Sequence, residues 1–321
     1  MNSFLETLAE HHAQVLTVDA VLHSGRTAYQ DVLIFENRLF GKVLVLDGVI
    51  QLTERDNHIY HEMIAHVPMM AHGSARRVLI IGGGDGGTLR EVLRHPVAEV
   101  VLVEIDEGVI ALSQRFLPEV SGGAFSDRRA TVIVGDGSLY VADAMSPFDI
   151  IIVDSTDPAG PGERLFSEAF YRGCLELLRP GGILALQSGT PFYRPDQLDD
   201  IRGRLAASFA AIRPFMAPVP TYAGGMLALV VASASHRALQ PSTRTLRARF
   251  RRLQGQTRYY VPDVHQAAFA MAPAFVRGAR PFPSNQPPTR VATSRPNNDS
   301  APAAVAAQAQ RGERVKAKTE A

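Results

Sequence analysis

Apolar residues occur in two different patterns along the chain. Between residues 15 and 52 they form short, β-branched runs that are separated by turn-forming segments such as Asp47-Gly48. The runs are Val15–Val18, Asp31–Phe35 and Lys42–Leu46. Runs of this kind, bounded by glycine and asparagine, are typical of strands that are joined by hairpins. The first part of the chain is therefore predicted to form a small antiparallel sheet.

Farther along, the pattern changes to an apolar segment, a glycine-containing turn and a helical stretch, repeated several times. The apolar segments are Arg77–Ile81, Glu99–Val103, Ala130–Val134, Asp149–Val153 and Ile183–Gln187. Helical patterns at Thr88–Arg94, Gly108–Phe116 and Ser167–Leu178 lie between them. Parallel neighbouring strands need such crossover connections. We therefore predict an α/β fold with a doubly wound, mainly parallel sheet, which binds ligands beyond the carboxyl ends of its strands.

We expect these patterns to divide the 321 residues into two domains and a tail. Residues 1–70 are predicted to form the N-terminal β-domain and a linker, and residues 71–280 the catalytic α/β domain. From Pro281 the composition becomes rich in proline and alanine. Such a segment lacks the apolar residues that a core needs, so residues 281–321 are predicted to be a disordered tail.

The composition fits a globular protein, with 46% hydrophobic and 20% charged residues. The formal charge is only +1, so it gives no reason to expect nucleic acid or a membrane as a partner. Residues 280–321 hold seven basic and three acidic residues, an excess of +4, which leaves −3 on residues 1–279. This mildly acidic body suits a small cationic substrate better than an anionic one.

The single cysteine, Cys174, excludes an intrachain disulfide and a zinc site built from cysteines. No early apolar leader or membrane-length apolar run is present. We therefore expect a soluble, cytoplasmic protein. His61 and His66 would lie about 140° apart around a helix, so we expect no metal site there.

A glycine-rich loop follows the first of the predicted parallel strands. Gly82, Gly84 and Gly87 have the spacing of a nucleotide-binding loop, and the strand before them and the helix after them are the expected context. Glu104 lies at the end of the next strand, which is the position of the acidic residue that binds ribose hydroxyls in nucleotide-binding folds. These features predict a ligand that contains a nucleoside.

Asp85 places a carboxylate inside this loop. Two like charges about 4 Å apart repel by roughly 1 kcal/mol in water and by more in a partly desolvated cleft. A dinucleotide is therefore disfavoured, and a ligand that presents an amine is favoured. The alternative is that Asp85 caps the following helix or turns away.

Acidic residues also follow two later strands. Asp136 can accept a hydrogen bond from an adenine amino group while Gly137 leaves room for the ring, although an ordinary Asp-Gly turn is the alternative. The segment Asp154–Pro161 holds Asp154 and Asp157 in a turn stiffened by two prolines. Capping does not readily explain both acids, so this turn is predicted to bind ligand.

Over residues 3 to about 278, the sequence resembles the polyamine aminopropyltransferases, the spermidine synthase family. The motifs that carry the resemblance are Val43–Gln51, Thr53–Asp56, Ile59–Met63, Val78–Glu91, Val103–Asp106, Gly135–Gly137, Asp154–Pro161, Pro180–Gly182 and Pro220–Tyr222. The resemblance implies a small N-terminal β-domain, a methyltransferase-like Rossmann domain and a homodimer or homotetramer. It also implies a transferase that moves the aminopropyl group of decarboxylated S-adenosylmethionine to putrescine. The products would be spermidine and 5′-methylthioadenosine, with the donor as a co-substrate and no permanently bound cofactor or metal.

The resemblance further implies roles for individual residues. Those that hold the donor are Gln30, Gln51, Asp85, Glu104, Asp136, Gly137 and Pro161. Those that form the acceptor cleft are Tyr60, His61, Asp85, Asp154, Ser155, Thr156, Asp157 and Tyr222. Asp85 would meet the aminopropyl amine, and Asp154 would be the proton acceptor.

The chemistry of the reaction agrees with these roles. A carbon bonded to a sulfonium is already activated, so the protein need only align an amine and remove its proton. Alkylamines titrate near the lysine value of about 10.4 and arrive as ammonium ions. We expect Asp154 to take the proton while Asp157 anchors the charge; the alternative for Asp154 is a purely electrostatic role in binding.

Other functions stay open. A methyltransferase would share Glu104 and Asp136, but its intact donor carries a carboxylate where Asp85 lies, and the same charge disfavours a nicotinamide dehydrogenase. Another acceptor amine is left open by Thr190 and Ala223, where relatives vary. A catalytically inactive partner of a synthase would not need a deprotonating carboxylate.

Overall fold

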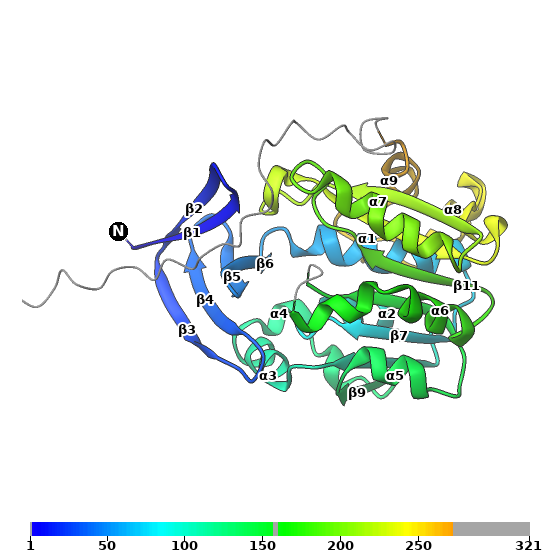
Figure 1. Ribbon diagram of the computed structural model, residues 1–321, viewed down its shortest axis with the longest axis horizontal. Helices are drawn as coiled ribbons and strands as arrows, with labels where there is room; N and C mark the ends of the chain where they lie inside the picture. The colour runs from blue at the N-terminus through cyan, green and yellow to red at the C-terminus, as the bar shows by residue number, and fades with distance from the viewer. Residues whose placement is uncertain (1, 157–159, 272–321) are drawn as a thin grey trace, which may run out of the picture. The chain divides into compact units, whose positions relative to one another are not determined.

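The computed structural model describes residues 2–156 and 160–271 of the chain (Figure 1). All of them belong to one compact unit, Met1–Ala279. The predicted tail, 281–321, lies outside the described residues. Within these ranges, none of the helices has both the length and the apolar character needed to cross a membrane.

The N-terminal part forms two antiparallel sheets. A hairpin of β1 (Asn2–Ala9) and β2 (His12–Val18) precedes a four-stranded sheet of order β3-β4-β5-β6. Its strands are β3 (Ala20–Arg26), β4 (Asp31–Asn37), β5 (Gly41–Leu46) and β6 (Val49–Thr53). Alternate side chains of this sheet enter two small cores, which explains the short apolar runs in its sequence. The predicted antiparallel sheet is confirmed.

The larger sheet has seven strands in the order β12-β13-β11-β10-β7-β8-β9. The first five in the chain are β7 (Arg77–Gly82), β8 (Glu99–Glu104), β9 (Ala130–Val134), β10 (Phe148–Asp154) and β11 (Leu178–Gln187). These five pair in parallel, while β12 (Ala211–Ala217) and β13 (Leu227–Ser233) join antiparallel at one edge. The strand order reverses between β7 and β10, and such a switch point opens a crevice for ligand.

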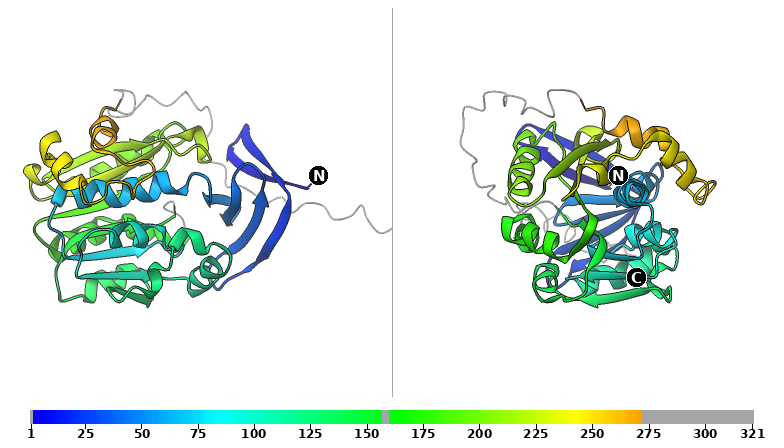
Figure 2. Two further views of the ribbon diagram at one scale, coloured as in Figure 1. Left: turned by 180° about the vertical axis from the view of Figure 1, so that it is seen from behind. Right: turned by 90° about the vertical axis from the view of Figure 1, so that its right-hand side faces the viewer.

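Helices cover both faces of this sheet (Figure 2). Ile80 and Ile152 enter a core with α1 and α2, whereas their neighbours Ile81 and Val153 enter a second core with α6 and α7. The helices are α1 (Asn57–His72), α2 (Gly87–Leu93), α3 (Glu107–Phe116), α4 (Pro118–Ser121), α5 (Gly137–Asp143), α6 (Glu168–Leu177), α7 (Pro195–Ala206), α8 (Thr243–Phe250) and α9 (Pro262–Ala268). The interior strands β7, β8, β10 and β13 are buried on both faces, so their residues are apolar without alternation, whereas the edge strand β9 is only partly covered. The doubly wound, Rossmann-like fold is confirmed.

Helix α1 begins directly after the small sheet and packs against one face of the larger one. It ends at Gly73, which has a φ of 82° and donates its N–H to the Met69 carbonyl oxygen at 2.8 Å. Arg249 also donates to the terminal carbonyls of α1, those of Met70 and Ala71. The helix extends across the predicted domain boundary at residue 70, and that boundary stays a prediction.

Candidate active site

The glycine loop follows β7 and is hydrogen-bonded to the carboxyl end of the neighbouring strand β10. Gly82 has a φ of +82°, and a Cβ there would lie 2.1 Å from the carbonyl oxygen of Asp154, so only glycine fits. The N–H of Gly83 donates to the same oxygen at 2.8 Å. The loop therefore fixes the backbone of Asp154 beside the start of α2.

Asp154 lies at the centre of the site. Its Oδ1 accepts a hydrogen bond from the Tyr60 hydroxyl at 2.5 Å. Its Oδ2 is buried and has no hydrogen-bond partner of ordinary geometry among the described residues. Burial, and then the negative charge of Asp85, raise the pKa of Asp154 above its ordinary value. Hydrogen bonds with Thr88 and Tyr60 lower this pKa, but they do not outweigh the rise. A buried carboxyl of raised pKa is suited to accept a proton.

His61 and Asp85 form an ion pair beside Asp154. The two atoms, His61 Nε2 and Asp85 Oδ1, are 3.3 Å apart, and the histidine is only 1% exposed. Burial opposes a charge on His61, but the Asp85 carboxylate outweighs it and raises the pKa of the imidazole. Burial likewise opposes a charge on Asp85, and His61 outweighs it and lowers the pKa of the carboxyl. The pair thus keeps Asp85 ionised at the mouth of the glycine loop.

Asp85 also accepts a hydrogen bond from the first residue of α2, although Gly86 is the N-cap, so the alternative interpretation of its sequence position holds in part. Its Oδ1 accepts the N–H of Gly87 at 2.6 Å. This hydrogen bond and the ion pair use the same oxygen, so the hydrogen bond does not turn the side chain away from the site.

Two tyrosines form a wall of the site. The ring centroids of Tyr60 and Tyr222 are 6.2 Å apart, and the Tyr222 hydroxyl donates to the backbone oxygen of Gln51 at 2.6 Å. Burial and the adjoining Asp154 raise the pKa of Tyr60 well above its ordinary value, so its hydroxyl stays protonated and donates. The side-chain amide of Gln51 donates to the Val49 carbonyl at 3.2 Å.

Glu104 lies at the end of β8 and is 8% exposed. It accepts the N–H of Gly84 at 3.1 Å and that of Asp106 at 2.9 Å. Burial raises the pKa of Glu104 to about 7. Its carboxylate therefore contacts the glycine loop, and the predicted binding of ribose hydroxyls stays a prediction.

Gln30 reaches this region from the small sheet. Its side-chain nitrogen donates to Oδ2 of Asp106 at 2.9 Å, and the Thr27 hydroxyl donates to the same oxygen at 2.6 Å. Asp106 in turn caps α3 by accepting the N–H of Gly108 at 3.0 Å. The turn before β4 is thus attached to the carboxyl end of β8.

Asp136 and Gly137 have clear structural roles. Asp136 caps α5 through Ser138, whose N–H and hydroxyl lie 2.8 and 2.6 Å from Oδ1. Burial works against its charge, but these hydrogen bonds outweigh it and lower the pKa of Asp136. A Cβ on Gly137 would lie 2.2 Å from Cγ2 of Ile81, so glycine is required by packing. The other carboxylate oxygen of Asp136, Oδ2, lies 3.8 Å from Nη1 of Arg164.

The turn after β10 is only partly described. The Ser155 hydroxyl donates to the carbonyl of Thr156 at 3.1 Å, and Gln187 donates to the Ser155 carbonyl at 3.2 Å. Asp157 lies outside the described residues. Pro161 belongs to a 3-10 helix, Gly160–Phe166, but its side chain is outside the description.

Two buried aspartates that support the site were not singled out from the sequence. Asp56 accepts hydrogen bonds from the Thr53 hydroxyl at 2.5 Å and from the Thr221 hydroxyl at 2.7 Å. It thereby holds the loop that carries Tyr222 against the start of α1. Asp106 is the other. Both lie in motifs that carry the family resemblance, which was the only sequence signal for them.

Comparison with known proteins identifies the family. Residues 57–241 match the family described as "Spermine/spermidine synthase domain", and residues 4–54 match "Spermidine synthase tetramerisation domain". A polyamine aminopropyltransferase of Klebsiella pneumoniae (strain 342) is 45% identical over 279 residues, which are 87% of this chain and 97% of that protein. Polyamine aminopropyltransferase 1 of Pseudomonas aeruginosa is 48% identical over 272 residues, or 84% and 95% of the two chains.

Solved structures give the same result. A spermidine synthase in complex with the transition state analogue AdoDATO matches with a TM-score of 0.81 and 36% identity, covering 87% of this chain and 94% of that one. The Thermotoga maritima spermidine synthase matches with a TM-score of 0.79 and 34% identity, over the same shares. The chain belongs to the spermine/spermidine synthase family and is a transferase of the polyamine aminopropyltransferase type.

Proposed function

We propose that this protein transfers the aminopropyl group of decarboxylated S-adenosylmethionine to putrescine and releases spermidine and 5′-methylthioadenosine. The observation that carries the proposal is the buried group of Asp154, Tyr60, His61 and Asp85 at the carboxyl ends of β7 and β10. It holds one ionised carboxylate, Asp85, near enough to a second, Asp154, to raise the pKa of the latter. This is the arrangement needed to bind a cation and to remove a proton from it.

In the proposed reaction, the amine nitrogen attacks the aminopropyl carbon that is bonded to the sulfonium. The new C–N bond forms as the C–S bond breaks, and the electron pair of that bond passes to sulfur, which leaves as a neutral thioether. The nitrogen loses one proton, which the buried carboxylate of Asp154 accepts. No permanently bound cofactor or metal is needed, because the sulfonium supplies the leaving group.

The donor lies along the glycine loop in this proposal. Asp85, held ionised by His61, binds the amine of the aminopropyl group, and Glu104 accepts hydrogen bonds from the ribose hydroxyls. The other residues proposed to hold the adenosyl part are Gln30, Gln51, Asp136, Gly137 and Pro161. Ser138 occupies Oδ1 of Asp136, so adenine is proposed to donate to Oδ2, the oxygen that lies 3.8 Å from Arg164.

The acceptor amine occupies the space next to Tyr60 and Tyr222. Asp157 is proposed to anchor the far ammonium of putrescine, with Ser155 and Thr156 beside it. A diamine has a second positive charge that such a carboxylate can bind, so a diamine fits this cleft better than a neutral acceptor.

A test of the function uses two donors and several amines. Purified protein is incubated with decarboxylated or intact S-adenosylmethionine, each with putrescine, cadaverine, agmatine or spermidine, and products are identified by mass. We expect spermidine and 5′-methylthioadenosine from the decarboxylated donor with putrescine. A methylated product from the intact donor would identify a methyltransferase instead, and no turnover with either donor would favour an inactive partner of a synthase.

The protein is further proposed to act as a homo-oligomer, a dimer or tetramer, in the cytoplasm. The N-terminal residues match a family whose printed name is a tetramerisation domain. Leu5 and Val15 face each other across the β1–β2 hairpin and are 60% and 62% exposed. We propose that this pair belongs to an apolar surface that another subunit covers.

A further inference from the structure

Two neighbouring hollows lie at the edge of the large sheet opposite to the candidate active site. Arg76, Pro96 and Arg129, which line them, come just before β7, β8 and β9, whereas the glycine loop and Glu104 lie at the other ends of these strands. The hollows share Arg76 and Pro96. The larger has a volume of about 720 Å³ and lies between the end of α1, the turn after α2 and helix α8.

The larger hollow is strongly basic. Five arginines line it, and no aspartate or glutamate does. The arginines are Arg76, Arg94, Arg244, Arg249 and Arg252. His95 also lines the hollow, but burial lowers its pKa to about 3 and leaves it neutral. This concentration of positive charge contrasts with the net charge of −3 on residues 1–279.

Within residues 2–156 and 160–271, one of these five arginines forms an ion pair. Arg94 pairs with the buried Glu91, its Nη1 lying 2.9 Å from Oε2 of the carboxylate. Arg249 and Arg76 donate to uncharged backbone carbonyls, Arg249 to that of Ala71 at 2.7 Å and Arg76 to that of Pro96 at 3.1 Å. These bonds orient the two guanidinium groups but leave their charge uncompensated.

Arg244 and Arg252 are exposed, and neither guanidinium makes a hydrogen bond or ion pair within residues 2–156 and 160–271. Arg247, on the same helix as Arg244 but outside the hollow, differs in this respect, because it pairs with Asp263 at 3.0 Å. Like charges that gather in a concave site without a counterion raise the local potential and favour an anion there.

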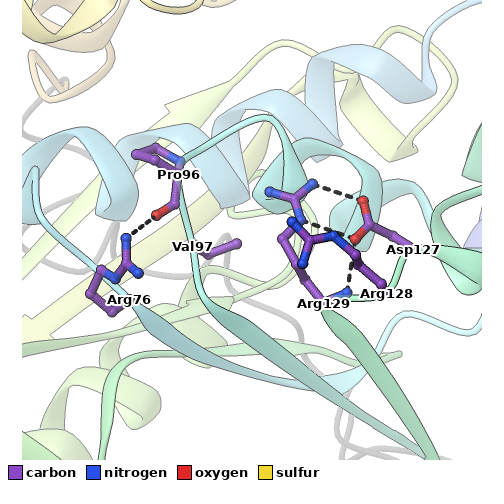
Figure 3. Close-up of a pocket in the computed structure, with 6 residues that line it drawn as sticks. All are labelled: Arg76, Pro96, Val97, Asp127, Arg128 and Arg129. Atoms are coloured by element: carbon purple, nitrogen blue, oxygen red, sulfur yellow. Dashed lines mark hydrogen bonds and ion pairs between the residues drawn. The ribbon is translucent and has the colours of Figure 1, made fainter.

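The smaller hollow continues this basic surface (Figure 3). Asp127 pairs with Arg129, whose Nη2 lies 2.8 Å from Oδ2, and this one carboxylate faces the three arginines that line the hollow, Arg76, Arg128 and Arg129. Arg76 lies between the two hollows and belongs to both.

We propose that the larger hollow binds an inorganic oligophosphate anion, a chain of two or three linked phosphates. The guanidinium fork matches the spacing of phosphate oxygens, and several arginines can bind successive phosphates. The hollow has the size of a small-molecule site. Its concave shape suits a short anion better than the backbone of a nucleic acid duplex. The site is separate from the active site and does not depend on the proposed function.

The experiment is a calorimetric titration of the full-length protein with sodium tripolyphosphate at low salt, about 50 mM. We expect saturable binding with one anion per chain, and binding of inorganic phosphate at least about tenfold weaker because it meets fewer guanidinium groups. The double variant Arg244→Gln/Arg252→Gln should weaken tripolyphosphate binding by about tenfold or more. The double variant Arg247→Gln/Arg251→Gln removes the same charge outside the hollow and should change it by less than about twofold.

Several results would overturn the proposal. These are the absence of saturable binding, equal affinity for phosphate and tripolyphosphate, or equal weakening by the two double variants. Tighter binding of a duplex oligonucleotide through Arg244 and Arg252 would assign the surface to nucleic acid instead. Because binding is measured without turnover, none of these results bears on the aminopropyl transfer.

Discussion

The hydrogen bond between Tyr60 and Asp154 lowers the pKa of a buried carboxyl. The hydroxyl donates to Oδ1 at 2.5 Å and works against the pKa rise that burial and Asp85 produce. Asp85 itself is kept ionised by His61. Two carboxylates at one site thus have opposite shifts of pKa. When their surroundings give two such groups different pKa values, one is suited to bind a cation and the other to accept a proton.

Replacement of Tyr60 by phenylalanine tests this adjustment. Loss of the hydrogen bond raises the pKa of Asp154, so the acidic limb of the kcat–pH profile should move to higher pH by up to about one unit. The rate at alkaline pH, where Asp154 is ionised in either protein, should change much less. Tyr171→Phe is the matched control, because Tyr171 is buried in the core on the other face of the sheet. An acidic limb that Tyr60→Phe leaves in place would contradict the role given to Tyr60.

Glu104 predicts a pH dependence for binding of the nucleoside product. Its pKa is about 7, and the ionised carboxylate is the stronger acceptor for ribose hydroxyls. Affinity for 5′-methylthioadenosine should therefore increase as the pH rises from about 6 to about 8, and Glu104→Gln should bind weakly without this increase. Calorimetry at each pH measures it. Asp136→Asn is the comparison, since the lowered pKa of Asp136 keeps it ionised throughout, so this variant should weaken binding without removing the pH dependence.

The parallel strands could be predicted because each is a short apolar run followed by a glycine turn. The antiparallel pair β12 and β13 could not. Pro214 lies inside β12 and opposes a strand assignment, yet β12 is the edge of the sheet, where a missing N–H is tolerated. β13 is a continuous apolar run buried on both faces, and periodicity alone does not distinguish such a run from a buried helix.

The site was predictable to the extent that its residues follow strands or belong to a family motif. Glu104, Asp136 and Asp154 lie at strand ends, and the structure brings Glu104 and Asp154 to the glycine loop. The contacts of Asp56 with Thr221 join residues 165 positions apart, and no local pattern in the sequence indicates such a contact. The roles of the individual residues in binding and catalysis stay predictions.

Asp56 joins three elements: the end of β6, the start of α1 and the loop that holds Tyr222. Asp56→Asn replaces one acceptor oxygen by an amide donor that faces a hydroxyl or an N–H. We expect the free energy of unfolding to fall by about 1–3 kcal/mol and the KM for putrescine to rise more than the KM for the donor. Urea denaturation and steady-state kinetics measure these effects. Asp47→Asn, in an exposed turn of the same sheet, should stay within about 0.5 kcal/mol of the natural protein; equal effects of the two variants would contradict the argument.

Charge is unevenly distributed over the whole molecule. The carboxyl ends of the strands carry Asp85, Glu104 and Asp154, which suit a cationic donor and amine, whereas the amino ends carry the arginine-lined hollow. The net charge of the sequence concealed this division, because it sums 33 basic and 32 acidic residues wherever they lie. Composition alone predicted a cationic substrate but gave no sign of a basic surface.

The exposed pair on the β1–β2 hairpin predicts how subunits associate. Leu5→Glu/Val15→Glu places two negative charges on the apolar surface and should lower the molar mass measured by light scattering. Leu139→Glu/Met145→Glu changes two other exposed apolar residues, in and just after α5, and should leave the mass unchanged. If the hairpin variant keeps the mass of the natural protein, or that mass is already one chain, this surface does not join subunits.

The most informative single measurement is the rate of spermidine formation by Asp154→Asn at saturating decarboxylated S-adenosylmethionine and putrescine. Loss of a general base typically costs about 10²–10⁴ in kcat, so we expect a decrease of that size with little change in either KM. The far-ultraviolet circular dichroism of the variant should match that of the natural protein. An intact saturated rate with a raised KM for putrescine would restrict Asp154 to binding the amine and contradict the proposed proton transfer.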